Sequence, residues 1–200
     1  MKRKVCGVDE VGRGAAVGRI FAAACILYEH KKIPDLNDSK QLSPKKRLAL
    51  SSLIKEGALD WHIAAADLQD INKLNVHYAS LLAMKRAIEG LSCGQPMLVL
   101  ADGRYSLEVA FECKNIVGGD KKVPAISAAS ILAKVARDRE MEDLDLEYPQ
   151  FGWKKNKGYL TKEHLDALMK YGPSPYHRQN YKPVKEAKRK RSGKLRENSQ

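Results

Sequence analysis

The segment MLVLA at residues 97–101 most constrains the fold of this chain, because it is an unbroken apolar run of strand length. A strand without polar alternation is typical of the interior of a sheet that helices cover on both faces. Around it, strand patterns alternate with helix patterns, and hairpin signals mix with crossover signals. The sequence therefore predicts a three-layer α/β domain.

The other predicted elements follow from periodicity and from turn and capping residues. The first two strands form a hairpin across Gly12 and Gly14, and Ser43 with Pro44 opens the first helix. The alanine-rich stretch from residue 124 is predicted to be the longest helix, because its small side chains allow close approach to a sheet. Strands are predicted at residues 5–11, 17–28, 61–65, 97–101 and 112–117, and helices at 43–54, 75–89, 124–146 and 161–171.

Charge separates a body at residues 1–181, of a length that suits one domain, from a basic tail at residues 182–200. The tail has eight basic and two acidic residues, a net charge of +6 out of +12 for the whole chain. Because its only large apolar residues are Val184 and Leu195, we expect it to be disordered. It would either add salt-dependent affinity for phosphates or only improve solubility. The overall charge favours a polyanionic partner such as nucleic acid.

Cysteine spacing and hydropathy exclude several classes of protein. The four cysteines lie far apart without a C-x-x-C pair, which favours neither a zinc site nor a disulfide framework. Charged residues interrupt the apolar segment that a signal peptide would need, and the apolar stretch at residues 15–27 is too short to span a bilayer. We therefore expect a cytoplasmic monomer with reduced cysteines and no membrane contact.

Four acidic residues occupy unusual places in this pattern. Asp9 and Glu10 interrupt an apolar strand, Asp102 ends the MLVLA strand, and Asp138 lies in the alanine-rich helix. If these side chains converge they need cations, because two carboxylates about 4 Å apart repel by about 4 kcal/mol at an effective dielectric near 20. A cluster of carboxylate oxygens suits Mg²⁺ or Mn²⁺. Adjacent residues on a strand point to opposite faces, so a shared site requires a twist or bulge at Glu10.

Plainer interpretations remain open for two of the acids. Asp138 could pair with a neighbouring base, and Asp102 before a glycine is ordinary turn chemistry. For Asp138 the candidate partners are Lys134, Arg137 and Arg139. A dinucleotide-binding loop is excluded, since the glycines at 12, 14 and 18 have the wrong spacing and precede a strand rather than a helix. The histidines adjoin no nucleophile elbow, and His164 is expected on a helix surface.

Six blocks along the chain carry a family resemblance. They are GVDEVGRG at residues 7–14, DSK at 38–40, LADG at 100–103, GGDKKVPAISAASILAKVARDR at 118–139, NKGYLTKEH at 156–164 and GPSPYHR at 172–178. In this order, and over nearly the whole chain, they resemble the successive motifs of the ribonuclease HII family (type 2 ribonuclease H).

The resemblance implies a ribonuclease H-like fold, with a central mixed sheet flanked by helices and a helical C-terminal region. It implies cleavage of the RNA strand of RNA/DNA hybrids, and cleavage 5′ of single ribonucleotides in DNA, leaving 3′-hydroxyl and 5′-phosphate ends. A role in ribonucleotide removal from DNA goes with this activity. The implied cofactors are two Mg²⁺ or Mn²⁺ ions, and the implied ligands are Asp9, Glu10, Asp102 and Asp138.

The resemblance also assigns substrate contacts. Gly12, Arg13 and Gly14 would approach the ribonucleotide and its 2′-hydroxyl, and Tyr159 would stack near the sugar. Weaker assignments are phosphate contacts by Lys40 and Lys122 and hydroxyl contacts by Ser39, Ser127 and Ser130. Lys122 could instead be a solvated loop lysine, Tyr159 a core residue, and Ser130 a small helix-packing residue.

Departures from the family pattern and rival interpretations complete the prediction. Ala15 and Arg19 stand where the family has prolines, and Val123 where it often has serine, which affects substrate detail rather than reaction type. The sister bacterial type of ribonuclease H is disfavoured, because it has an N-terminal extension and usually glutamate as the fourth acid. A non-catalytic binder of hybrid duplexes remains the alternative. Residues 194–200 lack an aromatic pair, so we expect no sliding-clamp contact there.

Overall fold

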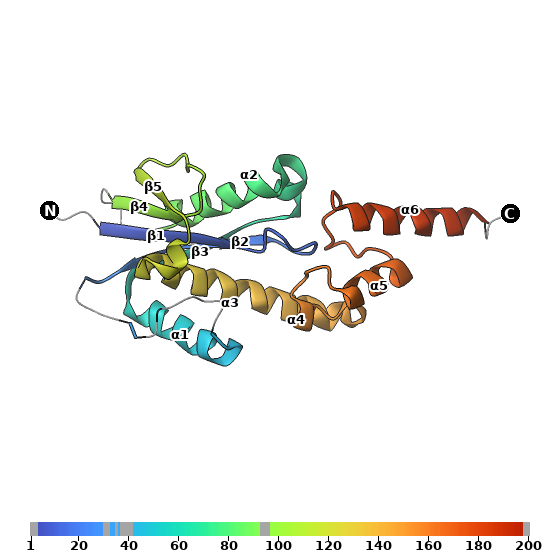
Figure 1. The fold of residues 1–200 in the computed structure, drawn as a ribbon, viewed down its shortest axis with the longest axis horizontal. Coiled ribbons are helices and arrows are strands. Elements are labelled where there is room, and N and C mark those ends of the chain that lie inside the picture. The colour runs from blue at the N-terminus through green and yellow to red at the C-terminus, as the bar shows by residue number, and fades with distance from the viewer. Residues whose placement is uncertain (1–3, 30–32, 35, 37–41, 93–96, 198–200) are drawn as a thin grey trace.

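The computed structural model describes residues 4–29, 33–34, 36, 42–92 and 97–197 (Figure 1). For residues 97 and 193–197 it describes the backbone alone. Its strands are β1 (Lys4–Val11), β2 (Ile20–Leu27), β3 (Ala58–Ala66), β4 (Met97–Asp102) and β5 (Glu112–Ile116). Its helices are α1 (Pro44–Gly57), α2 (Leu68–Glu89), α3 (Pro124–Glu147), α4 (Trp153–Asn156), α5 (Lys162–Tyr171) and α6 (Lys182–Glu197), with short 3-10 turns at Gly119–Lys121 and Pro149–Phe151.

The five strands form one mixed sheet in the order β3-β2-β1-β4-β5. β1 pairs antiparallel with β2 and parallel with β4, so the predicted hairpin and the predicted interior strand at residues 97–101 are both confirmed. β2 and β3 are antiparallel, whereas β4 and β5 are parallel. The central place of β1 puts its carboxyl end in the middle of one edge of the sheet.

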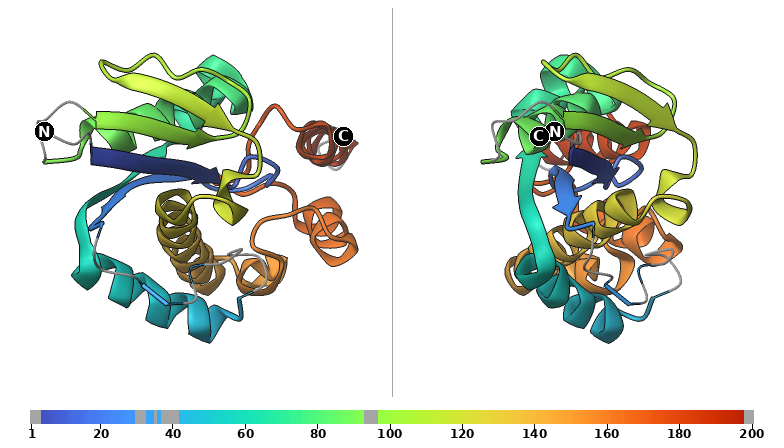
Figure 2. Two further views of the ribbon diagram at one scale, coloured as in Figure 1. Left: turned by 60° about the vertical axis from the view of Figure 1, so that its left-hand side comes forward. Right: turned by 90° about the vertical axis from the view of Figure 1, so that its left-hand side faces the viewer.

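Helices cover both faces of this sheet, which confirms the three-layer prediction (Figures 1 and 2). α2 packs on one face, over a core that includes Cys6, Val8 and Val99. α3 and α1 cover the other face, over a second core that includes Cys25. α3 comes closest at Gly7, where an added Cβ would lie 2.1 Å from the carbonyl carbon of Ala125. Only glycine permits this approach of a helix to the central strand.

Several element boundaries differ from the predicted ones: α1 ends at Gly57 rather than 54, β3 begins at Ala58 rather than 61, and the starts of β2 and α2 also differ. β2 begins at Ile20 rather than at residue 17, because Gly18 has φ +73° and Val17 instead forms an isolated bridge with His177. α2 begins at Leu68 rather than at residue 75, with Asp67 and Asp70 forming a capping box. Asn75, the predicted start, is a kink within α2 with φ +70°.

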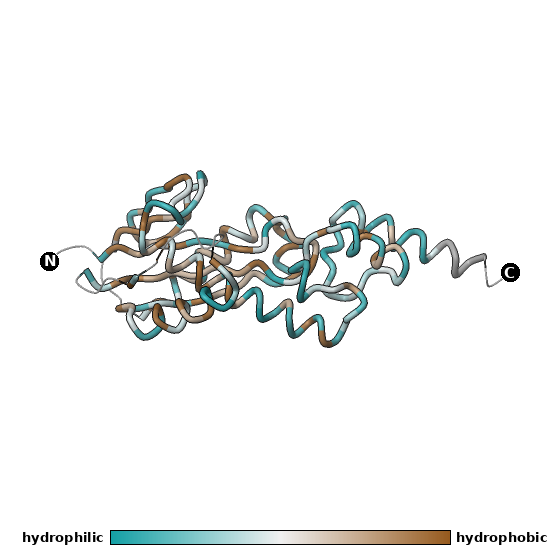
Figure 3. The backbone as a smooth tube through the Cα atoms, turned by 60° about the horizontal axis from the view of Figure 1, so that its bottom comes forward, coloured by the Kyte–Doolittle hydropathy of each residue, from teal (hydrophilic) through white to brown (hydrophobic). Residues whose placement is uncertain are grey.

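The expectation of a disordered tail is wrong for residues 182–197, which form α6. Val184 and Ala187 are buried in a small cluster with Leu168 of α5, and this packing explains the order that composition alone did not predict. α6 extends from one end of the molecule, far from the N-terminus, and its tube is mostly hydrophilic in colour (Figures 1 and 3).

Three of the four cysteines lie among the described residues. Cys6 and Cys25 are buried, as expected of small core residues, Cys113 is half-buried, and none of these three is in a disulfide within the described part of the chain. Cys93 lies outside the described residues. Among those residues, no helix is both long and apolar enough to cross a membrane.

Candidate active site

The first two acids lie on the central strand where its pairing with β4 ends. The last residue pair of that ladder is Val8 with Ala101, so Asp9 and Glu10 follow directly after it. Pairing with β2 runs in unbroken register through both acids, so of the predicted twist or bulge at Glu10 the bulge is excluded and the twist stays a prediction. Asp9 faces α3, where it interacts with Ser130, while Glu10 lines a shallow pocket with residues of α2. The two side chains thus lie on opposite faces of the sheet and approach the same site at the carboxyl end of β1.

Asp102 reaches the same site from the end of β4. Its Oδ1 accepts a hydrogen bond of 2.7 Å from the Gly119 N–H, which fixes the carboxylate at the 3-10 turn before α3. It also lines the shallow pocket that contains Glu10 and Arg13. Three of the predicted acids are therefore brought together by the carboxyl ends of two parallel, adjacent strands.

Burial and mutual repulsion dominate the electrostatics of this acid cluster, which we define as Asp9, Glu10 and Asp102. Burial raises the pKa of Asp9 well above its ordinary value, and the charges of Glu10 and Asp102 raise it further. Burial also raises the pKa of Glu10, against the effect of Arg13, whose guanidinium donates to Glu10 Oε1 at 3.2 Å. The folded chain thus holds charges in this cluster that it only partly neutralises.

The fourth predicted acid has a different environment. Asp138 of α3 accepts a hydrogen bond of 3.0 Å from the Arg47 guanidinium and forms a short ion pair with Lys134. The pairing with Lys134 is the plain alternative that the sequence left open, whereas Arg47 comes from α1, 91 residues away. Burial lowers the pKa of Lys134, against the effect of Asp138. In this structure two cations already neutralise Asp138.

The acid cluster has the chemistry of a divalent cation site, but it is not a complete one. Within the described ranges, no three carboxylate, histidine or cysteine side chains are close enough to form a ready metal centre. The donors are all oxygen, and the pKa values of Asp9 and Glu10 are raised by burial first and then by neighbouring negative charges. Such a set fits Mg²⁺ or Mn²⁺, which would relieve the repulsion.

The predicted ribose-contacting segment lies beside the acid cluster. Gly12 has φ +96°, and an added Cβ would lie 2.6 Å from Nε of Arg137, so the position requires glycine twice over. Gly14 is exposed and packs against the Tyr159 ring, to which an added Cβ would come within 3.5 Å. Tyr159 is 43% exposed, which excludes its interpretation as a core tyrosine. The loop and the aromatic ring together form an open surface.

The residues with weaker predicted contacts differ in their burial and partners. Ser130 is buried and interacts with Asp9, so it supports the acid rather than only packing a helix. Ser127 is also buried, one turn earlier on α3. Lys122 is exposed, and its ammonium donates to the Val117 carbonyl at 2.8 Å. Ser39 and Lys40 lie outside the described residues.

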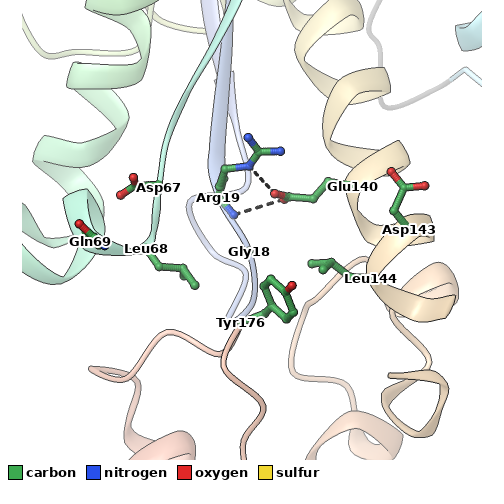
Figure 4. A pocket seen from close by; sticks show the side chains of 9 residues that line it. All are labelled: Gly18, Arg19, Asp67, Leu68, Gln69, Glu140, Asp143, Leu144 and Tyr176. Atoms are coloured by element: carbon green, nitrogen blue, oxygen red, sulfur yellow. Dashed lines mark hydrogen bonds and ion pairs between the residues drawn. The ribbon is translucent and has the colours of Figure 1, made fainter. Parts of the chain in front are cut away.

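The departures from the family pattern leave the acid cluster intact. Arg19 forms an ion pair of 2.6 Å with Glu140 and lies 4.8 Å from the centre of the Phe21 ring. The pair lines a separate pocket of about 450 Å³, which none of the four acids lines (Figure 4). Ala15 is fully buried. Val123 occupies the N-cap position of α3 without a side-chain hydrogen bond, which a serine could make there.

Sequence reasoning missed two buried polar groups next to the site. Arg137 and Arg178 are almost fully buried and bind backbone carbonyls of the loop at residues 12–19. His164 was expected on a helix surface, but it is fully buried against His177, with their Nε2 atoms 3.1 Å apart. Arg137 and His164 are polar residues on helices and Arg178 and His177 lie in the segment between α5 and α6, and no local pattern reports their burial because the carbonyl partners of the arginines are distant in sequence.

Comparisons with known proteins agree with this geometry. A family model described as Ribonuclease HII matches residues 6–184. The ribonuclease HII of Natranaerobius thermophilus is 54% identical over 181 residues, which cover 90% of this chain and 91% of that protein. The crystal structure of ribonuclease H2 from Pyrococcus horikoshii has a TM-score of 0.82 and 25% identity, covering 94% of this chain and 98% of that one. Bst-RNase HIII in complex with Mn²⁺ shares the fold, with a TM-score of 0.68, 18% identity and coverage of 92% and 69%.

Proposed function

This chain belongs to the ribonuclease HII family, and from that membership we propose that it cleaves the RNA strand of RNA/DNA hybrids and DNA 5′ of single embedded ribonucleotides. It is a ribonuclease H endonuclease. One observation carries the finer proposal: the acid cluster at the ends of β1 and β4 adjoins the exposed surface of Gly14 and Tyr159. A phosphate placed at the acids therefore puts its neighbouring sugar against that surface.

The four acids would hold two Mg²⁺ or Mn²⁺ ions, and the Mn²⁺ complex of a protein with the same fold supports this choice. Such ions supply an activated water and stabilise the departing 3′-oxygen, which gives 3′-hydroxyl and 5′-phosphate ends. Asp9, Glu10 and Asp102 provide oxygen ligands from a rigid sheet, and Ser130 orients Asp9. Asp138 would join them by exchanging its contacts with Arg47 and Lys134.

The substrate-binding surface distinguishes ribose from deoxyribose in this proposal. The loop at Gly12 to Gly14 brings backbone close to the sugar, and Arg13 adds an exposed guanidinium beside Glu10. Tyr159 offers an exposed ring for stacking on the sugar. Lys122 and the basic residues of α6 would contact phosphates without reading bases, since phosphate contacts carry no sequence information. This specificity suits removal of ribonucleotides from DNA.

A duplex with one ribonucleotide tests the proposal directly. The protein is incubated with it in Mg²⁺, Mn²⁺ or EDTA, and the products are separated on a denaturing gel. We expect a single nick 5′ of the ribonucleotide with either metal, and none in EDTA. Asp9→Asn and Asp102→Asn should lower the rate by about a thousandfold or more, since each removes several kcal/mol of charge stabilisation.

Glu89→Gln is the matched control, because Glu89 is an exposed acid at the far end of α2. It should keep the rate of the unmodified protein. A protein that binds hybrid duplexes equally with and without metal and never cuts them would instead be the non-catalytic binder. Full activity of Asp9→Asn would contradict the assignment of the acids.

A further inference from the structure

The loop between β1 and β2 turns its carbonyl groups toward the interior. Residues 12–19 form neither helix nor strand, so their backbone groups need partners outside regular structure. The carbonyls of Arg13, Ala15, Val17, Gly18 and Arg19 all accept hydrogen bonds from the buried guanidiniums of Arg137 and Arg178.

Arg178 donates hydrogen bonds at both ends of the loop, including the ribose-contacting segment. Its Nη1 donates to the carbonyls of Arg13 at 3.0 Å and of Ala15 at 2.6 Å, while Nε donates to that of Gly18 at 3.0 Å. The Tyr181 hydroxyl donates to the same Arg13 carbonyl at 2.8 Å. This carbonyl therefore has two donors, both from the segment that leads into α6.

Arg137 donates hydrogen bonds to the second part of the loop and to a neighbouring segment. Its guanidinium donates to the carbonyls of Val17, Arg19 and Lys157, and its side chain fills the space behind Gly12. Burial and the charge of Arg178 lower the pKa of Arg137 to about 10, so that guanidinium remains charged at neutral pH, and burial also lowers the pKa of Arg178. Two buried like charges are thus stabilised mainly by carbonyl dipoles of this loop, together with the Lys157 carbonyl and the Glu140 carboxylate, which lies 3.5 Å from Arg137 Nη1.

The orientation of one peptide group has a direct consequence for the substrate side. In a trans peptide the carbonyl of one residue and the N–H of the next point in opposite directions, and the described residues contain no cis peptide. With the Arg13 carbonyl directed inward to Arg178 and Tyr181, the Gly14 N–H points outward. Gly14 is exposed there next to the Tyr159 ring.

We propose that Arg178, assisted by Tyr181, is a positioning residue for ribose recognition, because it fixes the Arg13–Gly14 peptide with its N–H toward the bound sugar. This inference rests on the proposed function, in which that segment contacts the ribonucleotide. Lysine cannot reproduce these contacts, since an ammonium group donates from a single nitrogen, whereas three nitrogens of Arg178 donate to different carbonyls.

The test measures binding rather than cleavage. In an Asp9→Asn background, which prevents cutting, the dissociation constant is measured for a DNA duplex with one ribonucleotide and for the same duplex of DNA alone. Arg178→Lys should lower the preference for the ribonucleotide duplex about tenfold, and Tyr181→Phe a few fold, as expected for losing hydrogen bonds to one carbonyl. Affinity for the all-DNA duplex should stay unchanged, because phosphate contacts remain.

Arg86→Lys is the matched control. Arg86 also donates to a backbone carbonyl, that of Ala65, but it lies on α2 away from the loop. Its substitution should leave the preference unchanged, whereas a purely structural role of Arg178 would weaken binding of both duplexes in proportion to the unfolded fraction. Circular dichroism reports that fraction for each variant.

Two results would overturn the inference. A folded Arg178→Lys protein that keeps the parent's preference removes the positioning role, and if this variant does not fold, an unchanged preference in Tyr181→Phe does the same. A parent that binds both duplexes equally would overturn the proposed function and this inference with it, so the two failures are distinguishable.

Discussion

Two neighbouring regions of this molecule bury like charges, and they stabilise them in opposite ways. In the acid cluster, the described donors to the three carboxylates include one charged group, Arg13, and the pKa values of Asp9 and Glu10 are raised. In the arginine pair, the guanidiniums of Arg137 and Arg178 donate hydrogen bonds to several backbone carbonyls of the loop at residues 12–19. The guanidiniums are satisfied by the chain itself, whereas the carboxylates need cations from outside. A buried charge that lacks partners within the chain thus indicates a binding site. A buried charge whose partners all lie within the chain indicates a structural role.

Removing one arginine should produce the largest change in stability. Arg178→Met leaves several buried carbonyls without donors, and we expect it to lower the free energy of unfolding by about 3–5 kcal/mol. Urea denaturation followed by circular dichroism measures this loss. Asp9→Asn, which removes a repelled charge, should leave stability equal or increase it. A loss of similar size in both variants would contradict the distinction between the two regions.

Divalent cations should stabilise only the acid region. Binding of Mg²⁺ or Mn²⁺ to the folded state should raise the free energy of unfolding by about 2–3 kcal/mol at a hundred times the dissociation constant. Thermal unfolding with increasing metal measures the shift without any substrate. Asp102→Asn should reduce this shift strongly, whereas Glu89→Gln should keep it. An equal shift in Asp102→Asn would show that the cation binds elsewhere.

A third buried group extends the comparison to bases that stay neutral. Burial, with a contribution from His164, lowers the pKa of His177 to about 3, and burial also lowers the pKa of His164. Unfolded histidines bind protons below about pH 6.5 while the folded His177 does not, so stability falls as pH decreases from about 6.5 toward 3. His177 contributes about 1.4 kcal/mol per pH unit within that window, and His164 acts in the same direction.

The measurement is urea denaturation between pH 7 and 4 for the unmodified protein and for His177→Asn. The asparagine removes one titrating group but keeps an acceptor for the Ser174 N–H, which donates to His177 Nδ1 at 2.9 Å. The variant should therefore show a pH dependence that is shallower by about one proton. Parallel curves would mean that His177 titrates normally in the folded state.

Most of the fold could be predicted because its signals are local. An apolar run, glycine-separated strands and an alanine-rich helix are properties of short segments, and the predicted hairpin, interior strand and α3 are all present. The start of α2 was missed because the helical pattern is interrupted at Asn75, and the order of α6 because its partner Leu168 lies in another element. The first depends on a capping box before a kink, and the second on contacts of Val184 and Ala187 with Leu168.

In the candidate site, too, features with a local sequence signal could be predicted and features that depend on distant partners could not. Asp9, Glu10 and Asp102 could be singled out because charged residues rarely occur within or directly after apolar strands. The environment of Asp138 could not, since Arg47 is 91 residues away in the sequence. The contacts of Arg178 with the loop span about 160 residues, and no short pattern reports them.

These long-range contacts also order events during synthesis. A ribosome makes the loop at residues 12–19 first and adds Arg178 about 160 residues later, roughly ten to thirty seconds at typical rates of synthesis. Until then the nascent chain carries its acids without the arginine that shapes the loop. The loop therefore reaches its final conformation only after Arg178 has been made, which delays a competent nuclease until that point of translation.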